Sequence, residues 1–273
     1  MGTLCVQNLA LVIGEDCNLN CLHCLRGKKT KMVISDSVIE ETFNQIWYVH
    51  NLNICGGEPT MHIDRLRKVI ETIIQKRNIV ENISITINGT TFSKELINLA
   101  RYFIKHSHHR GLKKNTFRIY ISLDKYHFYE IQRLGLYNKF CNNISKYQKS
   151  KFFADFRTLD YDLYNEGNAK FLDAPKENFV PHLPIITYVG HKSEENRENG
   201  SCNIGPLITI STDGLLTEDN VSFENQVKFY NYGSIFDGRI DELLIQAGSE
   251  IVIPQTFKEE NGKILEKILE NKK

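Results

Sequence analysis

Short apolar runs rich in β-branched residues alternate with amphipathic stretches of helical periodicity along most of this chain. Such alternation is typical of βα units, in which each helix crosses back over the sheet and the strands run parallel. Ser37 and Glu40 have the spacing of a capping box at the start of the first helix. The sequence therefore predicts an α/β fold with a six-stranded parallel sheet. The predicted strands cover residues 8–13, 49–55, 83–87, 117–123, 152–159 and 184–189, and the predicted helical stretches cover residues 37–47, 64–76, 93–106 and 126–149.

Polar signatures stand where the predicted strands end. Three cysteines follow the first strand, the sequence Gly-Gly-Glu-Pro at 56–59 follows the second, and Asn88 follows the third. Ser122 and Asp124 close the fourth strand and should share a face, because strand side chains alternate. Since the carboxyl ends of parallel strands meet at one edge of a sheet, we expect a single functional site there.

Cys17, Cys21 and Cys24 form a CxxxCxxC pattern on one loop. Three thiolates can bind three corners of a cubane iron–sulfur cluster and leave the fourth iron open to an exogenous ligand. A structural zinc site is the alternative, but zinc takes four ligands, and the chain has no second CxxC. His23 would complete a Cys3His set only from an awkward position between two ligands. The spacing favours a [4Fe–4S] cluster.

The second motif makes the assignment specific. Gly-Gly-Glu-Pro follows the cysteine pattern by about 30 residues, at the end of the next predicted strand. Together the two motifs resemble the radical S-adenosylmethionine (SAM) superfamily, in which the second motif contacts the methionyl ammonium of SAM. The resemblance covers about residues 8–190 and implies the partial (β/α)6 barrel of that family, here with a small C-terminal β-hairpin and helix appendage.

The resemblance implies two cofactors, a [4Fe–4S] cluster on the three cysteines and SAM on its open iron. One-electron reduction then cleaves SAM to methionine and a 5′-deoxyadenosyl radical, which abstracts a hydrogen atom from the substrate. The electron implies a flavodoxin-like or ferredoxin-like donor. Ser122 and Asp124 would reach the ribose hydroxyls of SAM, and Asn88 would lie near its sulfonium. The residues expected to bind SAM are His23, Gly56, Gly57, Glu58, Pro59, Asn88, Ser122 and Asp124.

A polar, charged stretch at 191–200 marks a change in composition. It divides the chain into a predicted barrel, residues 1–190, and a predicted appendage, residues 191–273. The appendage resembles the SPASM or twitch extension of peptide-modifying radical SAM enzymes. That extension needs further cysteines, but none follows Cys202. We therefore predict a remnant that holds no auxiliary cluster.

Two elements are expected inside this appendage. Residues 207–210 and the chain from Leu215 onward flank Asp213-Gly214 in the pattern of a β-hairpin. Residues 258–273 have an amphipathic helical pattern.

Cys202 has two interpretations. It is either a buried structural thiol or a catalytic one that donates a hydrogen atom to a radical on a peptide α-carbon. The second resembles radical SAM peptide epimerases and would imply epimerisation. The segment Glu166-Gly167-Asn168-Ala169 likewise resembles a short EGxA-like segment of peptide-modifying members.

Charge and hydropathy exclude some classes of function. Lys and Arg number 34 and Asp and Glu number 33, so the near-neutral balance argues against a general nucleic-acid binder or a membrane-surface protein. The apolar run at 9–13 is too short for a signal peptide or a membrane span, which leads us to expect a cytoplasmic protein. Arg26, Lys28, Lys29 and Lys31 follow the cysteine loop, either as a solvated charge run or as a contact for an acidic peptide or a phosphate.

The preferred function is that of a radical SAM enzyme acting on a peptide or protein, such as a ribosomally made precursor (RiPP). The alternatives are an enzyme for a small molecule or nucleotide, and a glycyl-radical-activating enzyme, since both can work with a single cluster. A non-catalytic iron–sulfur or zinc protein would need the cysteines but would leave residues 56–59, Ser122 and Asp124 without a purpose.

Overall fold

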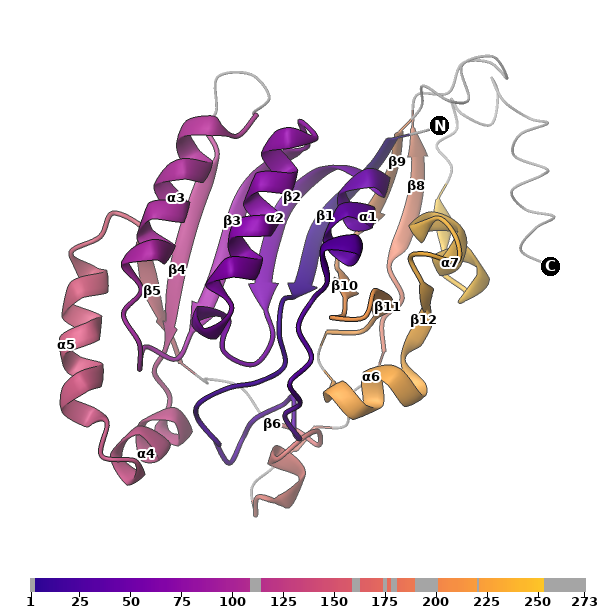
Figure 1. Cartoon of the computed structure of the whole chain (residues 1–273). Helices are drawn as coiled ribbons and strands as arrows, with labels where there is room; N and C mark the ends of the chain where they lie inside the picture. The colour runs from indigo at the N-terminus through magenta and orange to yellow at the C-terminus, as the bar shows by residue number, and fades with distance from the viewer. Residues whose placement is uncertain are drawn as a thin grey trace, which may run out of the picture.

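The computed structural model describes residues 3–108, 114–158, 163–173, 176–177, 181–189, 201–219 and 221–252. Its central sheet carries five parallel strands side by side in chain order, with α1, α2 and α3 packed on one face (Figure 1). The α/β fold with a parallel sheet is therefore confirmed. The strands are β1 (Thr3–Val12), β2 (Ile46–Cys55), β3 (Ile79–Ile87), β4 (Thr116–Ser122) and β5 (Phe153–Arg157), and the helices are α1 (Asp36–Gln45), α2 (Ile63–Gln75), α3 (Lys94–His106), α4 (Lys125–Arg133) and α5 (Tyr137–Gln148).

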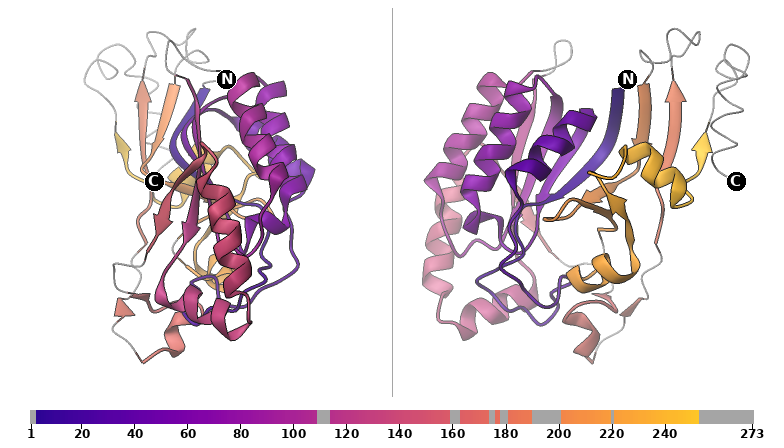
Figure 2. Two further views of the ribbon diagram at one scale, coloured as in Figure 1. Left: turned by 90° about the vertical axis from the view of Figure 1, so that its left-hand side faces the viewer. Right: turned by 45° about the vertical axis from the view of Figure 1, so that its right-hand side comes forward.

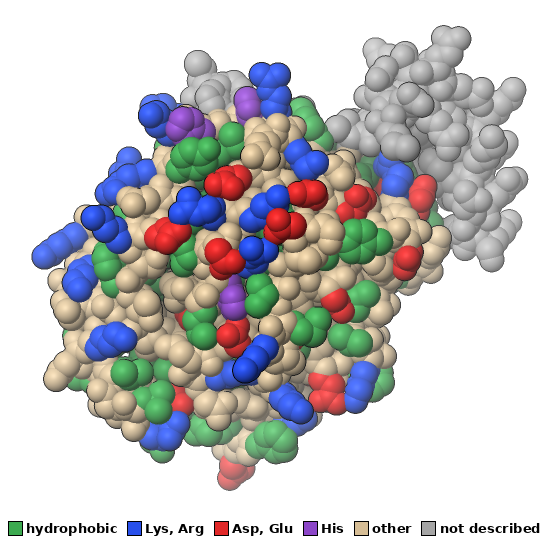
Figure 3. Space-filling model, viewed as in Figure 1, with side chains coloured by type: hydrophobic (Ala, Val, Ile, Leu, Met, Phe, Trp, Pro, Cys, Tyr) green, Lys and Arg blue, Asp and Glu red, His purple; other side chains and the backbone are tan. Residues whose placement is uncertain are grey.

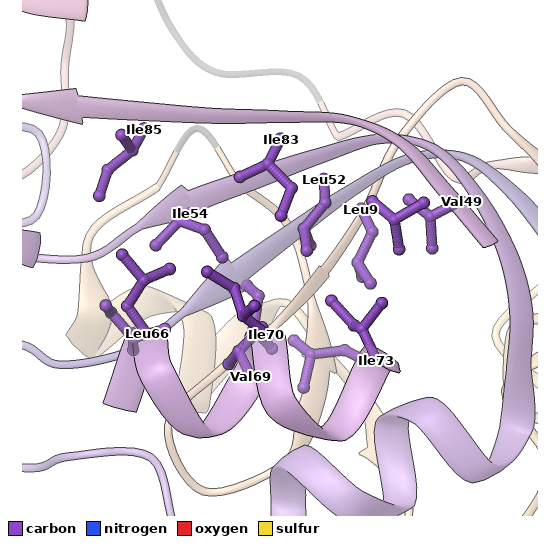
Figure 4. Packing of buried hydrophobic residues seen from close by; sticks show 14 of the residues in the cluster. Leu9, Val49, Leu52, Ile54, Leu66, Val69, Ile70, Ile73, Ile83 and Ile85 are labelled. Atoms are coloured by element: carbon purple, nitrogen blue, oxygen red, sulfur yellow. The ribbon is translucent and has the colours of Figure 1, made fainter. Parts of the chain in front are cut away.

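The core lies between the sheet and this helical layer. The apolar residues of α2 recur at helical spacing, so one stripe of the helix faces the strands (Figure 4). Full burial of each such side chain stabilises the fold by about 1.5–3 kcal/mol. The residues in this contact, all at most 2% exposed, include Leu9, Leu52, Ile54, Leu66, Val69, Ile70, Ile73 and Ile83.

The opposite face of the same strands carries a ladder of side-chain amides. Asn51 donates from Nδ2 to Oδ1 of Asn8 (2.8 Å), and Asn82 donates from Nδ2 to Oδ1 of Asn51 (3.1 Å). Thr116 donates its hydroxyl to Oδ1 of Asn82 (2.6 Å). These four residues are direct partners across β1, β2, β3 and β4, so the ladder ties the parallel strands together in one register.

Helix boundaries differ from the predictions where a local hydrogen bond or a glycine decides. Ser35, not Ser37, caps α1, because its side chain accepts from the main-chain N of Val38 (3.2 Å). Trp47 belongs to β2 rather than to the helix. The stretch predicted as one helix at 126–149 is two, α4 and α5, because Gly135 adopts a left-handed φ of 67° between them.

The C-terminal part extends the same sheet beyond β1 (Figure 2). Strand β9 runs parallel to β1, and β8 runs antiparallel to β9. The strand predicted at 184–189 is thus present as β8, but it joins the sheet on the β1 side and not beside β5. The antiparallel pair β10 and β11 confirms the predicted hairpin. The elements are β8 (Ile185–Val189), β9 (Ser201–Gly205), β10 (Ile208–Ile210), β11 (Leu215–Thr217), α6 (Phe223–Phe229), β12 (Asn231–Ser234), α7 (Ile240–Gln246) and β13 (Ile251–Val252).

Two short strands, β6 (Leu163–Tyr164) and β7 (Lys176–Glu177), form a separate pair near the one-turn helix η2 (Ala169–Phe171). A second such turn, η1 (Pro59–Met61), follows β2. The helix predicted at 258–273 lies outside the described residues, and the division at residue 190 stays a prediction. Among the helices that the structure describes, none has the length and apolar character needed to cross a bilayer.

Candidate active site

The carboxyl ends of the central strands, at the lower edge of the sheet in Figure 1, surround a cavity of about 410 Å³. Residues predicted from four separate strand ends meet there, so the expectation of a single site is met in space. Their individual roles toward SAM stay predictions. Those that line the cavity are Cys17, Cys21, His23, Cys24, Gly56, Gly57, Glu58, Pro59, Asn88 and Ser122.

Side chains from neighbouring elements hold the cysteine loop, which has no regular secondary structure of its own. Asn88, just after β3, donates from Nδ2 to Oδ1 of Asn18 (2.8 Å), and Asn18 donates to the hydroxyl of Thr90 (2.7 Å). On the other side, Glu130 of α4 accepts from the main-chain N of Asn20 (3.0 Å). The loop is therefore fixed to both β3 and α4.

The three thiols suit iron. Burial raises the pKa of Cys17 to about 11 and also raises the pKa of Cys21, where the charges of Cys17 and Cys24 add to the effect. The thiolates thus lie close enough to repel one another, in a place where little water stabilises them. Iron ions supply the positive charge that such a set requires. These residues fit a [4Fe–4S] cluster.

The two glycines of the Gly-Gly-Glu-Pro motif allow β2 to approach the cysteine loop. The main-chain N of Gly57 donates to the carbonyl of Gly14 (2.8 Å). A Cβ on Gly56, which has a φ of 139°, would lie 2.1 Å from the oxygen of Gly14, and one on Gly57 would lie 2.0 Å from the oxygen of Asp16. Gly56 and Gly57 are predicted to bind SAM, and in the structure the nearest neighbours of both are the main chain of the cysteine loop.

Glu58 is 2% exposed and joins β2 to β3. Its carboxylate accepts from the main-chain N of Asn88 (2.8 Å) and from that of Thr60 (3.1 Å). Burial raises the pKa of Glu58, and the hydrogen bonds from Thr60 and Asn88 oppose that rise. Glu58 therefore positions Asn88 at the cavity, while its own contact with SAM stays a prediction.

Asp124 caps α4 and supports a histidine. Its Oδ1 accepts from the main-chain N of Tyr126 (2.9 Å) and of His127 (3.0 Å), and its Oδ2 lies 2.5 Å from Nδ1 of His127. Burial alone raises the pKa of Asp124, but the bond and charge of His127, with the charge of His23, outweigh it and lower the pKa to about 2. His127 lines the cavity, whereas Asp124 is not among its lining residues. The predicted ribose contact therefore falls on a carboxylate that is already engaged.

His23 packs beside this pair. Its ring stacks on Tyr126 and meets His127 edge-on, each with ring centroids 4.8 Å apart. Burial lowers the pKa of His23 to about 4, so the imidazole is neutral. One ligand atom each from Cys21, His23 and His127 lies within 4.8 Å of the others, an arrangement that also suits a single zinc ion. Measuring the iron and zinc content of the protein therefore distinguishes a [4Fe–4S] cluster from a single zinc ion at this site.

Polar side chains of the strands line the inner part of the cavity. Asn53 of β2, Ser84 and Thr86 of β3 and Ser122 of β4 all contribute to it, and Ser84 donates its hydroxyl to Asn53. Within the described part of the chain, the amide nitrogen of Asn53 and the hydroxyls of Thr86 and Ser122 form no hydrogen bond. The strands thus present open hydrogen-bonding groups to a bound molecule.

The segment around Gly167 clamps the cysteine loop, a role that its sequence did not reveal. Asn168 donates from its main-chain N to the carbonyl of Cys24 (2.8 Å) and from Nδ2 to the carbonyl of Cys21 (3.1 Å). Gly167 has a φ of 55°, and a Cβ there would lie 2.2 Å from the oxygen of Leu25. Only glycine therefore fits this close approach.

The same clamp reaches the C-terminal part. Glu166 is buried, and its carboxylate accepts from the main-chain N of Ser222 (3.1 Å) and from Nδ2 of Asn225 (2.9 Å) at the start of α6. The cysteine loop and α6 are thus held by consecutive residues of one segment.

Arg26 corrects the expectation of a solvated charge run. Its side chain is 12% exposed and forms a 2.6 Å ion pair with Asp219, which follows β11 and also lines the cavity. Lys29 donates to the carbonyl of Cys17 (3.0 Å). Lys28 and Lys31 are exposed. Arg26 and Lys29 therefore have structural contacts, whereas Lys28 and Lys31 face the solvent.

The structure does not bring Cys202 to this site. Cys202 lies in β9 opposite Leu4, at the amino end of β1, whereas the cysteine loop follows Val12 at the carboxyl end. Eight residues of strand separate the two positions, a span of about 26 Å. The thiol is 2% exposed, and burial raises its pKa. The geometry supports the structural interpretation of Cys202, and the predicted donor role has no support from it.

The site combines a parallel sheet, three clustered thiols after its first strand and a glycine-rich motif after its second strand. This combination defines a class of iron–sulfur enzyme. A sequence profile of the Radical SAM superfamily matches residues 11–152, which is more than half of the chain. The chain belongs to the radical SAM superfamily. It is accordingly an enzyme whose cofactors are a [4Fe–4S] cluster and SAM.

More specific relatives are distant. A probable GTP 3′,8-cyclase of Pyrococcus abyssi is 32% identical over 91 residues, and the match spans 32% of this chain but only 28% of that protein. The solved structure of anSMEcpe with bound AdoMet and Cp18Cys peptide aligns at 13% identity over 94% of this chain and 82% of that one, with a TM-score of 0.46. SuiB of Streptococcus suis bound to S-adenosylmethionine aligns at 13% identity over 86% and 64%, with a TM-score of 0.42.

Proposed function

We propose that this radical SAM enzyme abstracts a hydrogen atom from a peptide or protein substrate. When bound, the cluster and SAM supply the chemistry, in which one electron cleaves SAM to methionine and a 5′-deoxyadenosyl radical. The chain supplies placement: Asn88, Glu130 and Asn168 fix the cysteine loop, and the strands enclose the reacting groups away from bulk water.

The observation that carries the proposal is that the C-terminal segment builds part of the cavity wall. Asp219 lines the cavity and pairs with Arg26, directly after the cysteine loop. Glu166 binds the start of α6. The segment that resembles the extension of peptide-modifying members is therefore positioned to contact a substrate.

The polar lining agrees with a peptide. Main-chain amides offer donors and acceptors at regular intervals, which suit the open groups of Asn53 and Thr86 on adjacent strands. A hydrogen-bonding site of this kind rejects analogues that lack the matching groups. We also propose a cytoplasmic location, where thiols stay reduced.

The test uses anaerobically reconstituted enzyme with SAM, dithionite and candidate short peptides in deuterated water. Mass spectrometry should show 5′-deoxyadenosine together with a mass change in one peptide, which for epimerisation is the one retained deuterium. GTP serves as the comparison because the sequence relative is a probable GTP cyclase. A new nucleotide product with GTP, and no change in any peptide, would show that the alternative function is correct.

A further inference from the structure

Among the described residues, three lysine or arginine side chains line the active-site cavity, and two of them already have partners. Arg26 pairs with Asp219, and Lys29 donates to the carbonyl of Cys17 (3.0 Å). The third is Arg157, the exposed last residue of β5. Across the described ranges of the chain, its guanidinium forms no hydrogen bond and no ion pair. Arg157 therefore brings a positive charge and open N–H donors to the cavity.

Basic side chains on the outer surface are paired differently. Over α1 and α2, acidic and basic side chains stand next to one another (Figure 3), and ion pairs join Arg65 to Asp36 (2.8 Å) and Lys68 to Glu40 (2.7 Å). Such pairs are already neutral, so they attract a further anion only weakly. Arg157 has no such acid in the part of the chain that the structure describes, and its charge is available to a ligand.

The ring of Tyr120 fixes the position of this guanidinium. The central carbon of the guanidinium lies 4.4 Å from the ring centroid, a cation–π contact between β4 and β5. The contact uses the charge of the group and leaves its N–H donors without an acceptor. Thr86, the direct partner of Tyr120 across β3 and β4, also lines the cavity. A fixed fork of N–H donors is the arrangement that binds a carboxylate through two parallel hydrogen bonds.

Three acidic residues lie close to Arg157 in the sequence. Asp155 is two residues earlier on β5; its Oδ1 accepts from the main-chain N of Phe156 (2.7 Å), and no ion pair joins it to Arg157. Asp160 and Asp162 follow β5 and lie outside the described residues. A test of any ligand for Arg157 therefore has to include these two positions.

Arg157 stands apart from the place expected for the cluster. The register of the strands puts Asn88, just after β3, level with Ser122 on β4, and Ser122 pairs with Arg157 on β5. Nδ2 of Asn88 lies 3.8 Å from Sγ of Cys17. Since neighbouring strands are about 4.8 Å apart, Arg157 is about 10 Å further along the sheet. SAM is expected on the open iron with its methionyl end near residues 56–59, so an anion at Arg157 belongs to the substrate.

We propose that Arg157 binds a carboxylate of the substrate, namely the side chain of an Asp or Glu close to the residue that is modified. The proposal rests on the peptide substrate proposed above and names the feature by which that peptide is selected. Two N–H groups of the guanidinium donate to the two carboxylate oxygens, with no covalent step. A peptide with Asn or Gln at the same position leaves the cation without its partner, so it binds less tightly.

The first experiment measures access to each arginine and does not depend on turnover. Anaerobically reconstituted enzyme with SAM is treated with phenylglyoxal, which modifies accessible arginines, and mass spectrometry of a digest locates the modified residues. The probes are two capped tripeptides, acetyl-Ala-Glu-Ala-amide and acetyl-Ala-Gln-Ala-amide. We expect Arg157 to be modified in the free enzyme, and at least about fivefold less with the Glu probe than with the Gln probe. Arg118, an exposed arginine of β4 that does not line the cavity, is the control and should be modified equally with both.

The variant D160N/D162N tests the two acids outside the described residues. We expect the same modification of Arg157, and the same protection by the Glu probe, in this variant and in the wild type. Modification that appears only in the variant would show that one of these acids pairs with Arg157, which would overturn the proposal. Equal protection by the two probes would overturn it as well.

The second experiment uses a peptide that the enzyme modifies and reverses the charge on each side of the contact. R157E should raise the KM for an acidic peptide at least about tenfold, whereas R118E should keep the wild-type KM. Replacing the acidic residue of the peptide with Lys should recover most of this loss in R157E. Recovery of this kind indicates direct contact between the two groups, because changes at independent sites add.

The outcomes separate this proposal from the proposed function. Peptide modification with no preference for an acidic residue would overturn the role of Arg157 and leave the peptide substrate standing. Protection of Arg157 by the Glu probe, with no peptide modified, would support the carboxylate site and reject the peptide substrate. A loss of SAM affinity in R157E, measured by equilibrium dialysis, would assign Arg157 to the carboxylate of SAM and overturn the proposal.

Discussion

The cysteine loop and the surroundings of Cys202 place the same side chain in opposite settings. Cys17, Cys21 and Cys24 lie on an irregular loop at the carboxyl edge of the sheet, held by side chains from three other elements. Cys202 lies within a strand, paired with β1 and β8 through the main chain. The three loop cysteines lie together because they are close in sequence. Cys202 is distant in sequence, so its position along β9 decides that it lies near the amino edge of the sheet and not near the carboxyl edge.

The largest expected effect is the complete loss of iron. The Cys17→Ala, Cys21→Ala, Cys24→Ala triple variant should bind no cluster, whereas Cys202→Ala should keep about four irons per chain. Elemental analysis of anaerobically reconstituted protein measures both. A wild-type protein that holds one zinc, lost in His127→Ala, would instead identify Cys21, His23 and His127 as the metal site.

The clamp on the loop should produce the next largest effect. Gly167→Ala places a Cβ against the oxygen of Leu25 and should cost about 2–4 kcal/mol of unfolding free energy. Gly135→Ala is the matched control, because its φ of 67° is similar but nothing lies within 4 Å of the added Cβ. It should cost only about 1–2 kcal/mol. Equal losses in urea unfolding would show that the close approach to Leu25 is unimportant.

A smaller effect is expected at Glu58. Gln at this position replaces one carboxylate oxygen with an NH2 group that cannot accept, so the bond from either Asn88 or Thr60 is lost, a change worth about 1–3 kcal/mol. Displacement of Asn88 should weaken SAM binding, measured by equilibrium dialysis with labelled SAM. Glu40→Gln on the exposed face of α1 is the control. Unchanged affinity in Glu58→Gln would separate Glu58 from the cofactor site.

Acid unfolding should report on Asp124. Because its pKa of about 2 in the folded chain lies below the ordinary value of 3.8, the ionised group stabilises the fold above pH 4. This contribution, about 1–2 kcal/mol, is lost as the pH falls from about 4 to 2. Asp124→Asn should therefore flatten the pH dependence of stability in that range. Asp237→Asn, at an exposed position, should leave it unchanged.

The smallest effect is expected for Cys202 itself. Cys202→Ala should lower stability by about 1 kcal/mol and leave SAM cleavage unchanged. Chemical denaturation and chromatography of 5′-deoxyadenosine measure the two quantities. A variant that cleaves SAM normally but no longer converts its peptide would restore the hydrogen-donor interpretation and remove the contrast between the two regions.

The sequence predicted the parallel sheet because the apolar periodicity of strands such as 83–87 is local. It also predicted the cysteine loop, because all three thiols fall within one short stretch. The prediction that four strand ends converge succeeded for a general reason, since parallel strands share a carboxyl edge whatever their side chains.

The remaining parts of the site depend on contacts between distant residues. Asn168 reaches Cys21 across 147 positions, and Asp219 reaches Arg26 across 193. No local pattern encodes such pairs. Asp124 shows another limit, because a residue that ends a strand can also cap the next helix, and only the geometry reveals that its oxygens are already engaged.

The ladder of Asn8, Asn51, Asn82 and Thr116 ties β1, β2, β3 and β4 together at one level of the sheet. Its cross-strand bonds resist sliding of one strand past the next, and on β2 and β3 they lie two residues before the cavity-lining Asn53 and Ser84. Asn53 and Ser84 add one more cross-strand bond of this kind, whereas Thr86, further along β3, takes no part in such bonds. A protein built this way can exchange a cavity-lining residue such as Thr86 while the strands stay aligned, so its binding preference can change at little structural risk.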